Sequence, residues 1–311
     1  MLKNLLYWKY NKNVLEGFSM IHTLENKELR IQINDLGAEL SEIYDKANRR
    51  QVLWNGDPAF WGRRAPILFP NVGRCWQNQY LINGTTYQVG QHGFARDSQF
   101  SCTEKSETSV THVLTDSEET RKVYPFRFRL SITHQLSDRD LRVSWKVENL
   151  DEETSSFTIG GHPPFCIPAL SENPEAPYYL TFDGQKELTL SILDLSTGCV
   201  IPGKTETLHL TEGRCPVAPE LFDNDTLIFD NGQVEKAGIS FPDGTPYVEV
   251  SCPGFSNFGI WQAPGSSFVC LEPWMGRCDN SDFTQDLSHK PWVNSVPADQ
   301  VFEKSYVISI K

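Results

Sequence analysis

The 311-residue chain lacks several features by which common protein classes are recognised. None of its eight cysteines forms a C-x-x-C pair, so zinc-finger and dithiol redox motifs are absent and reduced thiols are favoured. No apolar run approaches the roughly 20 residues of a membrane-spanning helix, and the apolar run at the N-terminus is short for a secretory signal. We therefore expect a cytoplasmic protein without a membrane partner.

A surplus of basic residues is also missing. The net charge is −12 and the isoelectric point is about 5.1, which argues against a nucleic-acid partner. The sequence contains no Walker loop, dinucleotide fingerprint or G-x-S-x-G motif, and its seven histidines show no i, i+2 or i, i+4 spacing. We expect no cofactor and no metal site, and a small molecule as the partner.

Helical periodicity is scarce, whereas alternation with a period of two is common. Residues 126–136 and 141–150 alternate apolar and polar side chains around the polar turn 137–140, which predicts an antiparallel hairpin. Residues 80–89 predict a second hairpin around an Asn83-Gly84 turn. Short helices are expected only near residues 58–62 and 219–223. The chain is therefore predicted to be all-β, as a large sandwich or barrel.

No linker, repeat or charge block divides the chain. We expect one domain over residues 20–311. Residues 1–19 differ from the rest of the chain and are expected to be an N-terminal arm or an extension from an upstream start. The Pro-rich stretch 163–177 is interpreted as a long loop.

Two segments carry candidate acid–base residues. In GGHPPF (160–165), His162 follows a run of residues typical of β-strands and precedes two prolines that restrict the backbone. We expect a fixed imidazole with a pKa near neutrality, as a general acid or base requires. In CLEPWMGRCD (270–279), Glu272 ends an apolar run, where burial would raise its pKa. Taken singly, a hydrogen-bonded loop histidine and an exposed or ion-paired glutamate remain open as alternatives.

Two further segments combine charged and aromatic residues. In QHGFARD (91–97), Arg96 either contacts a substrate oxygen or pairs with Asp97, and the ion pair is the commoner outcome. Arg64 and Arg74, in residues 61–74, have the same two interpretations. Cys270 lies in an apolar strand, which favours an inert core thiol.

Taken together and in order, the motifs resemble the aldose 1-epimerase (galactose mutarotase-like) family, and among it the bacterial mutarotases found with lactose and galactose utilisation genes. The resemblance covers nearly the whole chain after Met20 and rests on GAEL (37–40), VLWNGDPAFW (52–61), RRAPILFPNVGR (63–74), QHGFARD, YPFRFRL (124–130), GGHPPF, FGIW (258–261) and LEPWMGRCD (271–279). It implies a β-supersandwich fold, in agreement with the strand pattern.

The resemblance also implies residue roles. Glu272 would be the base at the C1 hydroxyl of a sugar and His162 the acid at the ring oxygen, with His92 beside the ring oxygen. It implies a sugar-binding aspartate, and Asp225 is the candidate taken here, although Asp223 and Asp230 are not excluded. Candidates for the remaining sugar contacts are Arg64, Arg74, Arg96, Trp261 and Trp274.

The implied function is interconversion of the α and β anomers of a hexose by acid–base ring opening. One departure is that the bacterial branch is expected to end the glutamate motif with Ala-Asp, whereas this chain has Arg277-Cys278-Asp279. Two alternatives therefore stay open, a non-catalytic sugar sensor on the same fold and a hexose-6-phosphate 1-epimerase. The protein is expected to be a monomer or a homodimer.

Overall fold

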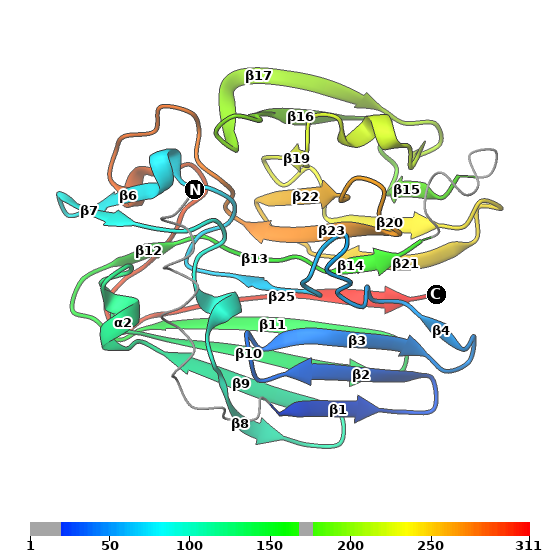
Figure 1. The fold of residues 1–311 in the computed structure, drawn as a ribbon, viewed down its shortest axis with the longest axis horizontal. Helices are drawn as coiled ribbons and strands as arrows, with labels where there is room; N and C mark the ends of the chain where they lie inside the picture. Colours follow the sequence, from blue (N-terminus) through cyan, green and yellow to red (C-terminus); the bar gives the residue numbers. More distant parts are fainter. Residues whose placement is uncertain (1–19, 168–176) are drawn as a thin grey trace.

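The computed structural model describes residues 20–167 and 177–311. The expected N-terminal arm 1–19 and most of the expected loop 163–177 lie outside the described residues. The described chain is built almost entirely of β-strands, which confirms the all-β prediction (Figure 1). No helix in these two ranges is long and apolar enough to cross a membrane.

The largest sheet has nine strands and contains the predicted long hairpin. Phe128 pairs with Asn149 and Ser137 with Asp140, which confirms the predicted antiparallel hairpin and its turn. The strand order is β18 (Arg214–Pro216), β15 (Tyr179–Phe182), β20 (Lys236–Ser240), β21 (Pro246–Ser251), β25 (Val301–Ile310), β11 (Asp140–Asn149), β10 (Phe128–Ser137), β9 (Ser109–Thr115) and β8 (Ser101–Lys105).

A second sheet of eight strands carries both candidate acid–base segments. Its strand order is β17 (Cys199–His209), β16 (Glu187–Asp194), β19 (Leu227–Phe229), β22 (Asn257–Trp261), β23 (Phe268–Met275), β13 (Ile159–Gly161) and β5 (Ile67–Leu68), with β14 (Pro164–Cys166) also paired to β23.

Smaller sheets complete the structure. One has four strands, β1 (Ile21–Glu25), β2 (Leu29–Asn34), β3 (Glu39–Asp45) and β4 (Arg50–Gln51). Two have two strands each, β6 (Gln79–Ile82) with β7 (Thr85–Gln88), which is the second predicted hairpin, and β12 (Ser155–Phe157) with β24 (Asn294–Val296).

The helical elements within residues 20–167 and 177–311 are short. They are α2 (Glu118–Arg121) and the 3-10 helices η1 (Trp76–Asn78), η2 (Ala95–Asp97), η3 (Pro219–Phe222) and η4 (Leu287–His289). Helix η3 matches the expected element near residues 219–223. The helix expected at 58–62 is wrong, because the backbone N–H groups of Phe60 and Trp61 both bond to the Asp57 carbonyl in a single turn that does not continue.

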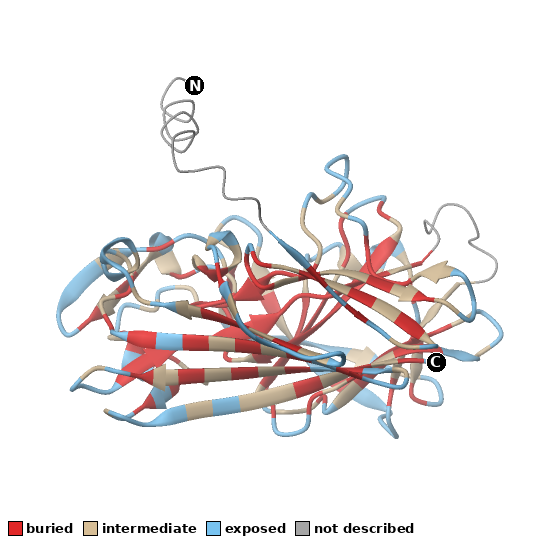
Figure 2. Cartoon of the chain, turned by 90° about the horizontal axis from the view of Figure 1, so that it is seen from below, coloured by how far each residue is buried: buried red, intermediate tan, exposed pale blue. Residues whose placement is uncertain are grey.

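The core lies between the sheets and draws apolar side chains from both large ones. Leu141 and Val250 come from the nine-stranded sheet, and Phe258 and Leu271 from the eight-stranded sheet, all nearly or fully buried. Along β10 buried and accessible residues alternate strictly. Figure 2 shows bands of buried and more accessible residues along the strands. The period read from the sequence therefore reflects strands with one face in the core.

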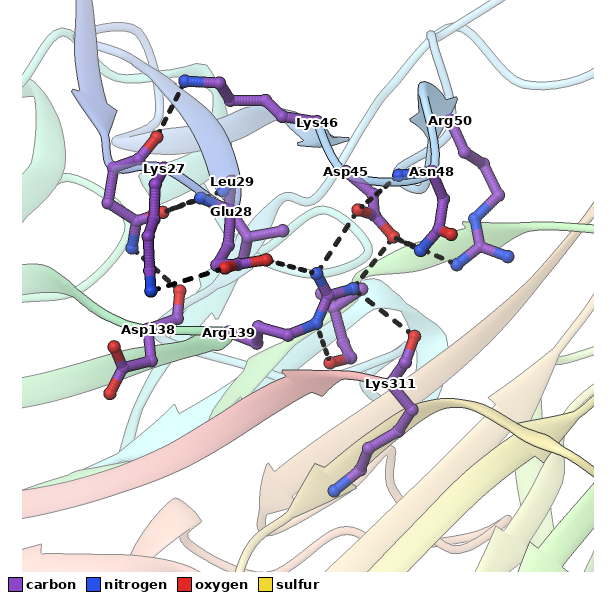
Figure 3. A network of polar contacts seen from close by, with 12 residues as sticks. Lys27, Glu28, Leu29, Asp45, Lys46, Asn48, Arg50, Asp138, Arg139 and Lys311 are labelled. Carbon is purple, nitrogen blue, oxygen red and sulfur yellow. Dashed lines mark hydrogen bonds and ion pairs between the residues drawn. The ribbon is translucent and has the colours of Figure 1, made fainter.

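A polar network joins the four-stranded sheet to the end of the long hairpin (Figure 3). Arg139, in the β10–β11 turn, donates to the Asp45 carboxylate at 2.9 Å and to the Ile310 carbonyl at 2.9 Å. Burial by itself would raise the pKa of Asp45, but hydrogen bonds from Arg139 and Asn48 outweigh it and lower the pKa to about 2. The Asp45 side chain is fully buried, so it depends on this partner.

We predict that Arg139→Met lowers the free energy of unfolding by about 2–3 kcal/mol at neutral pH, less than for a fully buried pair because Arg139 is partly exposed. The pKa of Asp45 is lowered in the folded state, so its contribution is present above the ordinary value of 3.8 and is lost as the pH falls towards 2. The difference in the free energy of unfolding between wild type and Arg139→Met should therefore become smaller as the pH falls from 3.8 towards 2, as measured by urea unfolding.

The matched control is Arg142→Met, an exposed site on the same hairpin whose side chain donates to the Ser305 hydroxyl. It should change stability by less than about 0.5 kcal/mol. Equal losses in the two variants would show that the Arg139 network has no special role.

Candidate active site

A cavity of about 450 Å³ lies over the eight-stranded sheet, within the size range of small-ligand pockets. Eight of the nine site residues predicted from the sequence line it, and Arg64 does not. Those eight are Arg74, His92, Arg96, His162, Asp225, Trp261, Glu272 and Trp274.

Strand pairing places His162 directly opposite Glu272. On β13, Gly160 pairs with Trp274, and on β14, Pro164 pairs with Cys270. Both strands pair with β23 in the same antiparallel register, so His162 in the gap between them falls at the position facing Glu272. Facing residues of an antiparallel pair project from the same side of the sheet. The result is a distance of 3.3 Å between His162 Nε2 and Glu272 Oε2.

Both side chains are almost completely buried. Burial and the neighbouring Asp225 raise the pKa of Glu272 well above 4.5, and the Trp274 indole opposes this shift. Burial lowers the pKa of His162 to about 3. The expectation of a near-neutral pKa for His162 is therefore wrong, because loss of water destabilises the imidazolium.

Aromatic rings enclose the imidazole of His162. The Trp61 ring stacks on it with centroids 4.8 Å apart and an interplanar angle of 29°, and Trp261 meets it edge-on at 5.7 Å. Trp61 was not predicted as a site residue, because its sequence motif carries no signal that separates a cavity wall from the core.

His92 lies beside His162, with ring centroids 5.7 Å apart. The backbone N–H of Gly73 donates to His92 Nδ1 at 3.1 Å, and the Gln91 side-chain amide nitrogen lies 3.2 Å from His92 Nε2. Burial, His162 and Arg96 lower the pKa of His92 well below 6.5. Burial therefore favours the neutral imidazole of His92 at the cavity, with a neighbouring group on each of its ring nitrogens.

Trp274 lies flat across the two strands that flank β23. A Cβ atom at Gly160 would come within 2.5 Å of its Cδ1, and one at Gly259 within 2.3 Å of its Cη2. Only glycine leaves room for the indole at both positions. Trp274 therefore forms an apolar floor next to Glu272, two residues away on the same face of the strand.

The arginines separate into two groups. Arg74 and Arg96 line the cavity. Arg96 donates to the Gln91 carbonyl at 2.6 Å, and its ion pair with Asp97 is looser, at 3.7 Å. Arg64 is held elsewhere, because its backbone N–H bonds to Glu39 and its side chain packs beside Gly56.

The three aspartates that the sequence could not rank have different surroundings. Asp225 lines the cavity, whereas Asp223 does not. Asp230 is buried and accepts hydrogen bonds from Arg277 at 3.0 Å and from Asn257 at 2.7 Å. Arg277, in the segment where this chain departs from the Ala-Asp ending expected of the family branch, therefore serves as the partner of Asp230.

The remaining wall includes parts that were not predicted from the sequence, namely Gln91, Thr226 and the turn after β16 at residues 195–198. Cys270 Sγ lies within 4.8 Å of one ligand atom each from His162 and Glu272, so these three could contact a metal ion. What the arrangement offers most directly is one acid and one base, 3.3 Å apart, on an aromatic surface suited to a sugar ring.

Comparison with known proteins agrees with this geometry. The profile of the family described as aldose 1-epimerase matches residues 20–227. The chain is 28% identical to the protein LacX of Lactococcus lactis subsp. lactis, over 92% of this chain and 98% of that protein.

Two solved structures are similar over nearly their full lengths. A galactose mutarotase related enzyme from Lactobacillus acidophilus has a TM-score of 0.87 and 30% identity, covering 94% of this chain and 97% of that one. A galactose mutarotase-like protein from Lactobacillus casei ATCC 334 has a TM-score of 0.85 and 29% identity, covering 94% and 100%. The β-supersandwich prediction is thereby confirmed, and the chain belongs to the aldose 1-epimerase family.

Proposed function

We propose that the protein interconverts the α and β anomers of an aldohexose, with Glu272 as the base and His162 as the acid. The observation that carries the proposal is the 3.3 Å separation of His162 Nε2 and Glu272 Oε2 at the base of the cavity. Ring opening removes the proton of the C1 hydroxyl and protonates the ring oxygen. Both oxygens are bonded to C1, so the two catalytic groups must lie close together.

The proton of the pair must move for these roles to operate. Burial raises the pKa of Glu272 and lowers that of His162, which favours a protonated carboxyl beside a neutral imidazole, so the proposed roles require that proton to pass to His162 when a sugar binds. A sugar in the cavity offers a hydroxyl donor to the carboxylate and an acceptor to the imidazolium, which favours the ionised form of the pair. After rotation about the C1–C2 bond, the reverse transfers close the ring as the other anomer.

Neighbouring side chains have supporting roles in the proposal. His92 lies beside His162, and its Nε2 can interact with the ring oxygen once a sugar displaces the Gln91 side-chain amide, which lies 3.2 Å away. Trp261 and Trp274 offer apolar faces to the sugar ring, and Asp225 offers a carboxylate to its hydroxyls. A cavity with binding groups alone would also suit a sugar sensor, so catalysis must be measured directly.

We predict that Glu272→Gln and His162→Asn each lower kcat for mutarotation by about 10²–10⁴-fold, the usual contribution of general acid–base catalysis. The measurement is polarimetry or NMR of freshly dissolved α-glucose and α-galactose. Matched controls are the exposed residues in Glu303→Gln and His209→Asn, which should keep wild-type rates. Unchanged rates in both cavity variants would refute the mechanism, and sugar binding without catalysis by the wild type would establish the sensor.

The buried carboxyl also predicts a pH-dependent cost to stability. Because the folded-state pKa of Glu272 is raised, its contribution to stability is present below the ordinary value of 4.5 and is lost as the pH rises through the folded-state pKa. Glu272→Gln should therefore be more stable than wild type at neutral pH, by about 1–2 kcal/mol. Urea unfolding from pH 4 to 8 measures the difference, and a difference that does not grow with pH contradicts it.

A second candidate substrate is a hexose 6-phosphate. Arg74 lines the cavity, and within residues 20–167 and 177–311 no carboxylate forms an ion pair with it. A free guanidinium at the wall of a sugar site would suit a phosphate group.

If the substrate is phosphorylated, Arg74→Ala should raise KM for the hexose 6-phosphate by about 10–100-fold, the loss of one or two charged hydrogen bonds. Kinetics with the free hexose should stay within a few-fold of wild type. Arg64→Ala is the matched control, since its side chain lies outside the cavity. Equal effects of Arg74→Ala on both sugars would exclude a phosphate role.

A further inference from the structure

A cluster of metal-ligating side chains lies outside the sugar cavity, where the four-stranded sheet meets the nine-stranded sheet. His22 is on β1, Asp35 follows β2, Cys102 is on β8 and His112 is on β9. Strands β1 and β9 are in contact, although they are far apart in sequence (Figure 1). We propose that these four residues form a structural zinc site that joins the two sheets.

The side chains already converge on a common point. His22 Nε2 lies 2.7 Å from Asp35 Oδ1, and His112 Nε2 lies 3.1 Å from the same oxygen. Cys102 Sγ and one ring nitrogen of each histidine lie within 4.8 Å of one another. Tetrahedral zinc with bonds of about 2.0–2.3 Å needs ligand atoms about 3.3–3.8 Å apart. The two distances to Asp35 Oδ1 are shorter than that range, so the carboxylate oxygen would move away from both rings to admit the ion.

The backbone holds the four positions in place. Cys102 and His112 are directly paired on β8 and β9, so their side chains share one face of the sheet, and a bulge follows Cys102. The Asp35 carbonyl accepts from Phe100 N–H, and its amide donates to the Met20 carbonyl, both at 3.0 Å. Three of the four residues therefore lie on strands, and backbone hydrogen bonds fix the turn that carries Asp35.

The buried part of this cluster converges on one carboxylate oxygen. His22, Asp35 and His112 are less than 10% exposed, and two imidazoles share one carboxylate oxygen. Both rings present Nε2 to that oxygen, so a cation bound there would contact the two ring nitrogens and the carboxylate together.

The donor set selects the metal. One thiolate, two imidazoles and one carboxylate match zinc, whereas magnesium and calcium prefer oxygen ligands alone. An ion can enter from solvent, because Cys102 is only partly buried and the Asp35 side chain keeps 11% of its surface exposed. The histidines are 90 positions apart in the sequence, which is why spacing rules did not find the site.

The test is titration of the chelator-treated full chain with Co²⁺ and Zn²⁺. Co²⁺ bound by a thiolate and imidazoles gives a sulfur-to-metal charge-transfer band and intense visible bands. We expect one Co²⁺ per chain, displaced by Zn²⁺, with a higher Tm in Zn²⁺ than without metal. Absence of the charge-transfer band in the wild-type protein would overturn the proposal.

Variants locate the ion. Cys102→Ser and His22→Gln should lose the charge-transfer band and the Zn²⁺-dependent rise in Tm. Cys270→Ser should keep both, because Cys270 belongs to the separate group beside His162 and Glu272. A band that survives Cys102→Ser or disappears in Cys270→Ser would overturn the assignment.

A measurement without substitutions guards against variants that fail to fold. Cys102 and Cys166 are both partly accessible thiols. Zn²⁺ should slow alkylation of Cys102 by iodoacetamide and leave Cys166 unchanged, as followed by peptide mass spectrometry. Equal rates at Cys102 with and without Zn²⁺ would contradict the site.

Discussion

The candidate site depends on one constraint, the common register of β13 and β14 against β23. The pairs Gly160 with Trp274 and Pro164 with Cys270 fix the position opposite His162, and that position is Glu272. The two prolines after His162 interrupt the strand without shifting its register. A slip of one residue would turn either side chain to the other face of the sheet. Acid–base geometry in this protein is thus a property of the sheet's hydrogen bonds.

Holding these groups away from water has an energetic cost that the rest of the fold must offset. The raised pKa of Glu272 opposes folding as the pH rises above its ordinary value of 4.5, and the lowered pKa of His162 opposes folding as the pH falls below 6.5. The extensive apolar core between the two large sheets supplies the opposing free energy. The exchange of stability for reactivity is common at active sites.

Much of the fold was predictable because its signals are local. The β10–β11 hairpin follows from the alternation of apolar and polar residues and from the polar turn between the strands. Both signals lie within one continuous segment of the sequence. The site was less predictable, because His162 and Glu272 are 110 positions apart and each has a commoner structural role when considered singly. The sequence did not show that Asp230 is the buried partner of Arg277, which distinguishes it from Asp225 at the cavity. Nor did it show that the backbone of Arg64 is bonded to Glu39, away from the cavity. Solvent exclusion, which sets the pKa of His162, is a property of the assembled structure alone.

The tryptophans around the cavity have a consequence for observing the protein. Three of its eight tryptophans, Trp61, Trp261 and Trp274, line the cavity, and Trp61 stacks directly on His162. Indole emission depends on the polarity and hydration around the ring. A molecule that displaces water from this cavity therefore changes the environment of more than a third of the indoles, and the protein carries its own fluorescent reporter of occupancy.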